Sequence, residues 1–81
     1  MVKIKIYTIP TSDWCEQLKA WLDKNGHSYQ EVDVEDNEKA REEMVNETGQ
    51  MAVPVIRVED EFIVGFNQEK ISDLIRKKKV N

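Results

Sequence analysis

The chain has 81 residues, of which 40% are hydrophobic, and its 12 basic and 16 acidic side chains give a formal net charge of −4. This length allows one modest core, so we expect residues 1–81 to form a single domain. The acidic balance argues against nucleic-acid binding, which needs a concentrated basic face, and no apolar run is long enough for a membrane span. A lone cysteine cannot form an intrachain disulfide, unlike the several that small secreted domains use, so we expect a cytoplasmic protein.

The first half of the chain alternates strand and helix patterns. Residues 2–7 alternate Val and Ile with Lys and Tyr, which is the period of a strand. From Asp13 the apolar residues recur at helical spacing, and Gly26 is expected to end that helix. A second strand over residues 29–34 precedes a helix that Asp36 is expected to cap. Strand, helix and strand with short connections predict a parallel pair joined by a right-handed crossover.

The second half predicts a hairpin and a final helix. Two β-rich runs, residues 53–58 and 62–64, are separated by three acidic residues and must pair antiparallel. Asn67 then precedes a helix with an apolar face over residues 71–75 and is expected to cap it. The order βαβαββα predicts an α/β domain, in which three helices cover a four-stranded mixed sheet.

Three segments resemble one known family. The loop Tyr7-Thr8-Ile9-Pro10-Thr11-Ser12-Asp13-Trp14-Cys15 is similar to the Y-T-x-P-T-C-P-W-C loop of glutaredoxins. Val53-Pro54-Val55-Ile56 resembles the family's cis-proline segment, and Val64-Gly65-Phe66-Asn67 resembles the loop before its last helix. The resemblance spans nearly the whole chain and implies the thioredoxin fold. In length the chain is most similar to short glutaredoxin-like proteins, including the electron donors of ribonucleotide reductase.

The resemblance implies thiol–disulfide exchange with an altered site. In the family, a thiolate at the start of the first helix attacks a disulfide, and a thiol three residues later resolves the intermediate. Ser12 matches the attacking position and Cys15 the resolving one, so we expect impaired dithiol turnover. Asp13 and Glu16 place carboxylates beside Cys15, which predicts a mostly protonated thiol at neutral pH. Cys15 then either reacts weakly by itself or packs as a small apolar group.

The serine has two open explanations. Either the chain has departed naturally from dithiol chemistry, or a cysteine was replaced by design, and the accompanying change to Asp13 favours natural departure. Ser12 and Asp13 also fit ordinary helix capping, because Asp13 and Glu16 have the spacing of a capping box.

A substrate groove is also implied by the resemblance. In the family the bond before the proline that matches Pro54 is cis, so that the backbone of Val53 faces an extended substrate. Tyr7 and Trp14 are expected to form an apolar rim around the loop.

The loop before the last helix completes the implied groove, with Gly65 and Asn67 as further binding residues. Asn67 and Gln68 would meet a glutathione carboxylate, or Asn67 simply caps the helix. Glutathione-binding members usually carry a Gly-Gly pair and an aspartate in this loop, and Gly65-Phe66-Asn67 departs from that pattern.

The implied partners are a disulfide-bearing protein or glutathione, with glutathione as co-substrate and no resident cofactor or metal. The electron donor, glutathione or a thioredoxin reductase, stays open. We expect a monomer, with His27 as a solvated turn residue and the basic run 76–79 as a solvated helix end. The alternative function is a redox-inactive module that uses the cis-proline groove to bind a peptide or thiol ligand.

Overall fold

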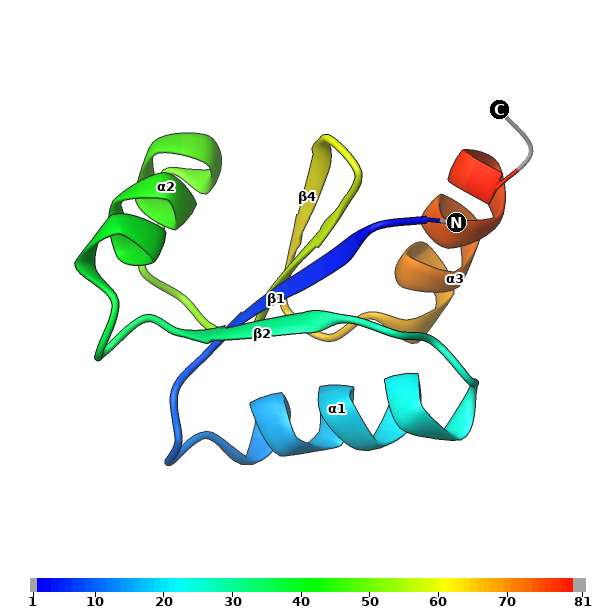
Figure 1. The fold of residues 1–81 in the computed structure, drawn as a ribbon, viewed down its shortest axis with the longest axis horizontal. Coiled ribbons are helices and arrows are strands. Elements are labelled where there is room, and N and C mark those ends of the chain that lie inside the picture. Colours follow the sequence, from blue (N-terminus) through cyan, green and yellow to red (C-terminus); the bar gives the residue numbers. More distant parts are fainter. Residues whose placement is uncertain (1, 80–81) are drawn as a thin grey trace.

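The computed structural model describes residues 2–79, and its elements follow the predicted order βαβαββα (Figure 1). They are β1 (Ile4–Thr8), α1 (Asp13–Lys24), β2 (Gln30–Asp33), α2 (Glu38–Thr48), β3 (Val55–Val58), β4 (Glu61–Val64) and α3 (Gln68–Lys79). The fold class predicted from the sequence is therefore confirmed, although the first three strands are shorter than the predicted runs and β4 begins one residue earlier than predicted.

The four strands form one mixed sheet in the order β2-β1-β3-β4. β1 and β2 are parallel, whereas β1 with β3 and β3 with β4 are antiparallel. Tyr7 lies in register with Val32 on one side and with Val55 on the other, and Val55 continues the row to Val64. Both the parallel pair and the hairpin expected from the sequence are present.

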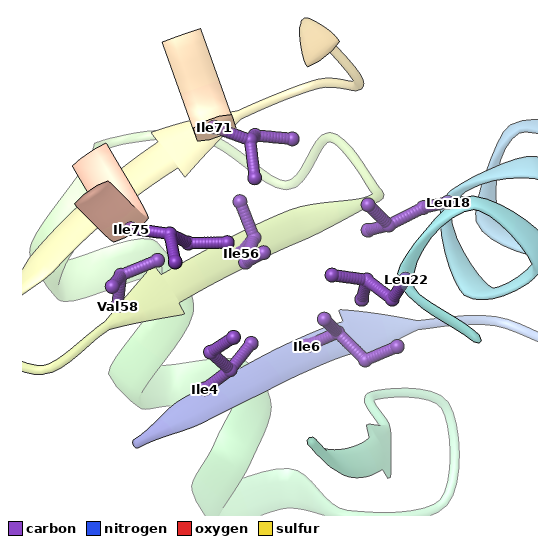
Figure 2. Packing of buried hydrophobic residues seen from close by; sticks show 8 residues of the cluster. All are labelled: Ile4, Ile6, Leu18, Leu22, Ile56, Val58, Ile71 and Ile75. Atoms are coloured by element: carbon purple, nitrogen blue, oxygen red, sulfur yellow. The ribbon is translucent and has the colours of Figure 1, made fainter. Parts of the chain in front are cut away.

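Helices cover both faces of this sheet, so each face of the central strands is buried. On one face, α1 and α3 pack their apolar residues onto β1 and β3 (Figure 2). This larger cluster consists of Ile4, Ile6, Leu18, Leu22, Ile56, Val58, Ile71 and Ile75. The smaller cluster lies under α2 on the opposite face and consists of Tyr7, Val34, Ala40, Met44 and Val55. Each fully buried Leu or Ile side chain contributes about 1.5–3 kcal/mol through the hydrophobic effect.

Side-chain oxygens begin the first two helices. The Ser12 Oγ accepts the Cys15 backbone N–H at 3.3 Å, and the Asn37 Oδ1 accepts the Ala40 N–H at 2.9 Å. The prediction that Asp36 caps α2 is therefore wrong by one residue, because Asn37 has the extended backbone of a cap.

The predicted capping box is also wrong. Asp13 is the first helical residue of α1 rather than its cap, and Glu16 instead pairs with Lys19 at 3.0 Å. Asn67, in contrast, caps α3 as expected, because its Oδ1 accepts the Lys70 N–H at 3.0 Å.

Two residues predicted to be solvated are not. His27 is half-buried with its ring 5.9 Å from that of Trp21, and burial lowers the pKa of His27, an effect that the nearby Lys79 charge increases. In the basic run 76–79, the Lys78 Nζ lies 2.9 Å from carboxylate oxygens of both Asp60 and Glu61, so it holds the end of α3 to the β3–β4 turn. In residues 2–79, no helix has the length and apolar character needed to cross a membrane.

Candidate active site

The three loops that carry the predicted site residues lie at one end of the sheet, together with the loop after β2. Because β1 and β2 are parallel, their carboxyl ends coincide, and the Val34 N–H donates to the Thr8 carbonyl at 2.9 Å. β3 begins and β4 ends at the same edge, where the Gly65 N–H donates to the Pro54 carbonyl at 2.8 Å. Figure 1 shows the loops after β1 and β2 on the side away from the two chain ends.

Ser12 and Cys15 form the start of α1. The Ser12 hydroxyl oxygen serves as the helix cap, and the Cys15 side chain points into the protein with only 1% of the residue exposed. The helix start therefore presents a hydroxyl, while the thiol lies behind it. Buried cysteines of this kind behave as small apolar groups until a movement of the chain exposes the sulfur.

Trp14 lies between these two residues and points outward, with 59% of the residue exposed. A second exposed apolar side chain, Met51 at 61%, precedes the proline segment, and sequence reasoning missed it. In the sequence, Met51 stands out only as an apolar residue in a loop next to the predicted binding segment that begins at Val53.

Tyr7 does not line the rim, so that prediction is wrong. The residue is fully buried beneath α2, and its hydroxyl donates to the Glu43 carboxylate. Strand alternation puts Tyr7 on one face of the sheet and Ile4 and Ile6 on the other, and α2 covers the face that carries Tyr7.

Glu43 of α2 meets three residues of the sheet, a cluster that sequence reasoning did not find. Besides the Tyr7 hydroxyl, it contacts the Lys5 Nζ at 3.1 Å and the Arg57 Nη1 at 3.6 Å. Burial, followed by the hydrogen bond to Glu43, raises the pKa of Tyr7 to about 12, and that same hydrogen bond, with Lys5 and Arg57, lowers the pKa of Glu43. The cluster fixes α2, and with it the following loop, against β1 and β3.

The Val53–Pro54 peptide bond is cis, with Val53 half-buried and Pro54 buried. Gly65 has φ +89°, a backbone conformation that favours glycine, and a Cβ there would meet no atom within 4 Å. Glycine is thus required at this position by backbone geometry and not by lack of space. The hydrogen bond from Gly65 to Pro54 holds the two loops together.

Lys19 is the basic residue nearest to Cys15 along α1, and two carboxylates hold it. Its Nζ lies 3.0 Å from Glu16 and 3.3 Å from Glu31, and the Glu31 carboxylate also accepts the buried Thr8 hydroxyl at 2.8 Å. The hydrogen bond to Glu16 is the largest cause that raises the pKa of Lys19. Its charge is therefore directed to these carboxylates. Within residues 2–79, no group of three or more His, Cys, Asp or Glu side chains is arranged to hold a metal ion.

Comparison with known proteins agrees with this geometry. A protein-family model described as glutaredoxin matches residues 4–63. The chain is 43% identical over 74 residues to an uncharacterized glutaredoxin-like 8.6 kDa protein in the rubredoxin operon of Clostridium pasteurianum, covering 91% of this chain and 99% of the relative.

Solved structures of glutaredoxins and glutaredoxin-like proteins share this fold. The glutaredoxin grx-1 of Archaeoglobus fulgidus superposes with a TM-score of 0.83 at 25% identity, covering 94% of this chain and 88% of the other. The glutaredoxin-like protein NrdH-redoxin of Escherichia coli superposes with a TM-score of 0.77 at 25% identity, covering 89% and 93%. The chain belongs to the glutaredoxin family.

Proposed function

We propose that this chain is a glutaredoxin-like thiol–disulfide oxidoreductase in which the loop Ser12-Asp13-Trp14-Cys15 impairs dithiol turnover. One observation supports this most directly: the Ser12 hydroxyl lies at the start of α1 as its cap, and Cys15 is 1% exposed behind it.

The chemistry explains the impairment. In disulfide exchange, an attacking thiolate forms a new S–S bond with one sulfur of the substrate, and the other sulfur leaves as a thiolate. A Ser12 oxygen cannot form that bond, so only Cys15 can attack, after a local opening. The mixed disulfide at Cys15 then has no second thiol in the chain to release it, and a thiol such as glutathione must do so.

Restoring the thiol tests the proposal. We expect Ser12→Cys to raise the rate of reduction of hydroxyethyl disulfide by at least about 100-fold, because the new thiolate would lie at a helix start that stabilises it. Ser12→Ala is the matched control, since it removes the hydroxyl without adding a nucleophile. A folded Ser12→Cys protein as slow as Ser12→Ala would show that the groove itself does not support exchange.

The burial of Cys15 and the exposure of Trp14 favour a second candidate function, a redox-inactive module that uses the cis-proline groove to bind an extended peptide or thiol ligand. In that case Cys15→Ala should bind a peptide as tightly as the unaltered protein. The measurement is the NMR shift of the Val53 amide and the Trp14 indole during titration, and the absence of any shift would contradict this candidate.

A protein disulfide fits the site better than glutathione. The loop Gly65-Phe66-Asn67 lacks the Gly-Gly pair and aspartate that the resemblance associates with glutathione binders. The E. coli NrdH-redoxin structure is described as having a thioredoxin-like activity profile, which supports the same preference here. We expect a monomer, because the lone thiol is buried and cannot readily link two chains. We expect a cytoplasmic location, because a single cysteine cannot form the intrachain disulfides of small secreted domains.

A further inference from the structure

The most exposed large apolar side chains of the described part of the chain all belong to the site end of the sheet. They are Trp14 at 59%, Met51 at 61% and Val64 at 38% exposure. Trp14 is the second residue of α1, Met51 precedes β3, and Val64 ends β4, so each adjoins one of the loops described above. Exposed apolar side chains confined to one end of a molecule are candidates for contact with a partner.

The same end of the molecule is acidic. We define the site end as residues 9–16, 33–38, 49–54 and 64–67, which are the loops and helix starts at this edge of the sheet. These segments contain six carboxylates and no lysine or arginine, and the exposed Lys39 follows directly after the last of them. The six are Asp13, Glu16, Asp33, Glu35, Asp36 and Glu38.

Four of these six carboxylates are available to a partner. Among residues 2–79, Glu16 alone of the six forms an ion pair, and Asp33 accepts the Glu35 backbone N–H. Asp13, Glu35, Asp36 and Glu38 are exposed to solvent. The basic run 76–79 lies near the chain ends, away from the loops after β1 and β2 (Figure 1). The basic run therefore lies away from the site end, next to the β3–β4 turn, where Lys78 pairs with Asp60 and Glu61.

The arrangement of the loops separates the two kinds of surface. Because the strand order is β2-β1-β3-β4, the acidic loop after β2 lies at one side of the site, and the Met51 and Val64 segments lie at the other. The start of α1, with Trp14 and Asp13, follows β1 between them.

We propose that the site end docks a cationic, partly apolar segment of a disulfide-bearing protein and disfavours anionic disulfides such as oxidised glutathione. This inference rests on the proposed function and specifies its substrate class. Apolar side chains of the segment would cover Trp14 and Met51, while its lysines or arginines would face Glu35 and Asp36. A local field of one sign raises the concentration of oppositely charged substrate at a site and lowers that of like charge.

Small disulfides of different charge test the inference with Ser12→Cys as the reporter enzyme. The probes are cystamine (cationic), hydroxyethyl disulfide (neutral) and dithiodiglycolate (anionic), with each rate divided by its rate with free cysteine. We expect cystamine to react about tenfold faster than dithiodiglycolate at roughly 20 mM salt and within about twofold of it at roughly 1 M, where the Debye length is near 3 Å. Equal normalised rates at low salt would overturn the inference.

Matched variants locate the effect. In the Ser12→Cys background, Glu35→Gln with Asp36→Asn should reduce the cystamine preference severalfold. Asp60→Asn with Asp73→Asn changes the net charge by the same amount, but these residues lie in the β3–β4 turn and in α3, outside the site end. This pair should leave the cystamine preference unchanged. An equal reduction by both pairs would indicate net charge and contradict docking at the site end.

A titration of the unaltered protein separates this inference from the proposed function. Two peptides with the same apolar centre, flanked by lysines or by glutamates, are titrated while the Trp14 indole signal is followed by NMR. We expect the lysine peptide to bind at least about tenfold more tightly at low salt. Equal affinities would refute the docking surface. If Ser12→Cys fails to reduce even the neutral disulfide, the proposed function fails, and the peptide preference still decides the inference.

Discussion

The contact between Tyr7 and Glu43 gives a prediction that can be worked through quantitatively. Tyr7→Phe keeps the buried ring and removes only the hydroxyl that donates to Glu43. A hydrogen bond to a charged acceptor contributes about 1.5–3 kcal/mol, but Glu43 would keep Lys5 and Arg57 as partners. We therefore expect the free energy of unfolding at pH 7 to fall by about 1–2 kcal/mol, and Tm to fall by about 4–16 °C in a domain of this size.

The pH dependence of this contact has a definite sign. The pKa of Tyr7 is raised from 10.0 to about 12, so the folded protein holds the phenol proton more tightly than the unfolded chain. The contribution to stability is therefore fully present below pH 10 and is lost as the pH rises toward 12. By pH 11 the loss amounts to about 1.4 kcal/mol, which Tyr7→Phe cannot show because it has no proton to lose.

Urea unfolding at several pH values between 7 and 11.5 measures both effects. Other groups also titrate in this range, so the informative quantity is the difference between the unaltered protein and Tyr7→Phe. That difference should shrink by about 1.4 kcal/mol between pH 9 and pH 11. A difference that stays constant over this range would refute the assignment of the raised pKa to the buried phenol. Combining Tyr7→Phe with Glu43→Gln should give a coupling energy of about 1 kcal/mol.

Two further predictions concern the backbone. Ser12→Ala removes the oxygen that accepts the Cys15 N–H and should lower the free energy of unfolding by about 1 kcal/mol, measured by thermal or urea unfolding. Ser12→Asp should lower it by less than about 0.5 kcal/mol because aspartate also caps helices, and equal losses in the two variants would exclude a capping role. Glu59 has φ +56°, so Glu59→Gly should be more stable than Glu59→Ala by about 1 kcal/mol, and an equal or reversed order would show that this turn carries no left-handed cost.

The fold could be predicted because its determinants are local. Strand alternation, helical spacing and terminal glycines are visible in single segments, and the short connections then restrict the topology. Errors arose where two neighbouring residues could serve the same purpose. Asp36 and Asn37 are both good caps, and the backbone that places Asn37 at the helix start is set by packing of α2, which no local pattern reveals.

The site was only partly predictable. Ser12 and Cys15 were identified by resemblance, but the environment of Tyr7 depends on contacts with Glu43, 36 residues away along the chain. Strand alternation alone places Lys5 and Tyr7 on one face, and the expectation of three helices around the sheet could have suggested that this face is covered. Which side chain of α2 meets them is decided by the register between the helix and the sheet, and so it requires the structure.

Serine at position 12 also has a structural role. Its oxygen accepts the Cys15 N–H, and a sulfur at the same position would be a weaker acceptor, so serine caps α1 better than a cysteine would. Asp13 then places a negative charge in the first turn, where the helix dipole favours it. Ser12 and Asp13 thus both stabilise the start of α1, the segment that would have to open for Cys15 to react under the proposed function. The loop is therefore better suited to presenting Trp14 from a fixed helix start than to repeated opening, and this is the physical reason to test binding alongside turnover.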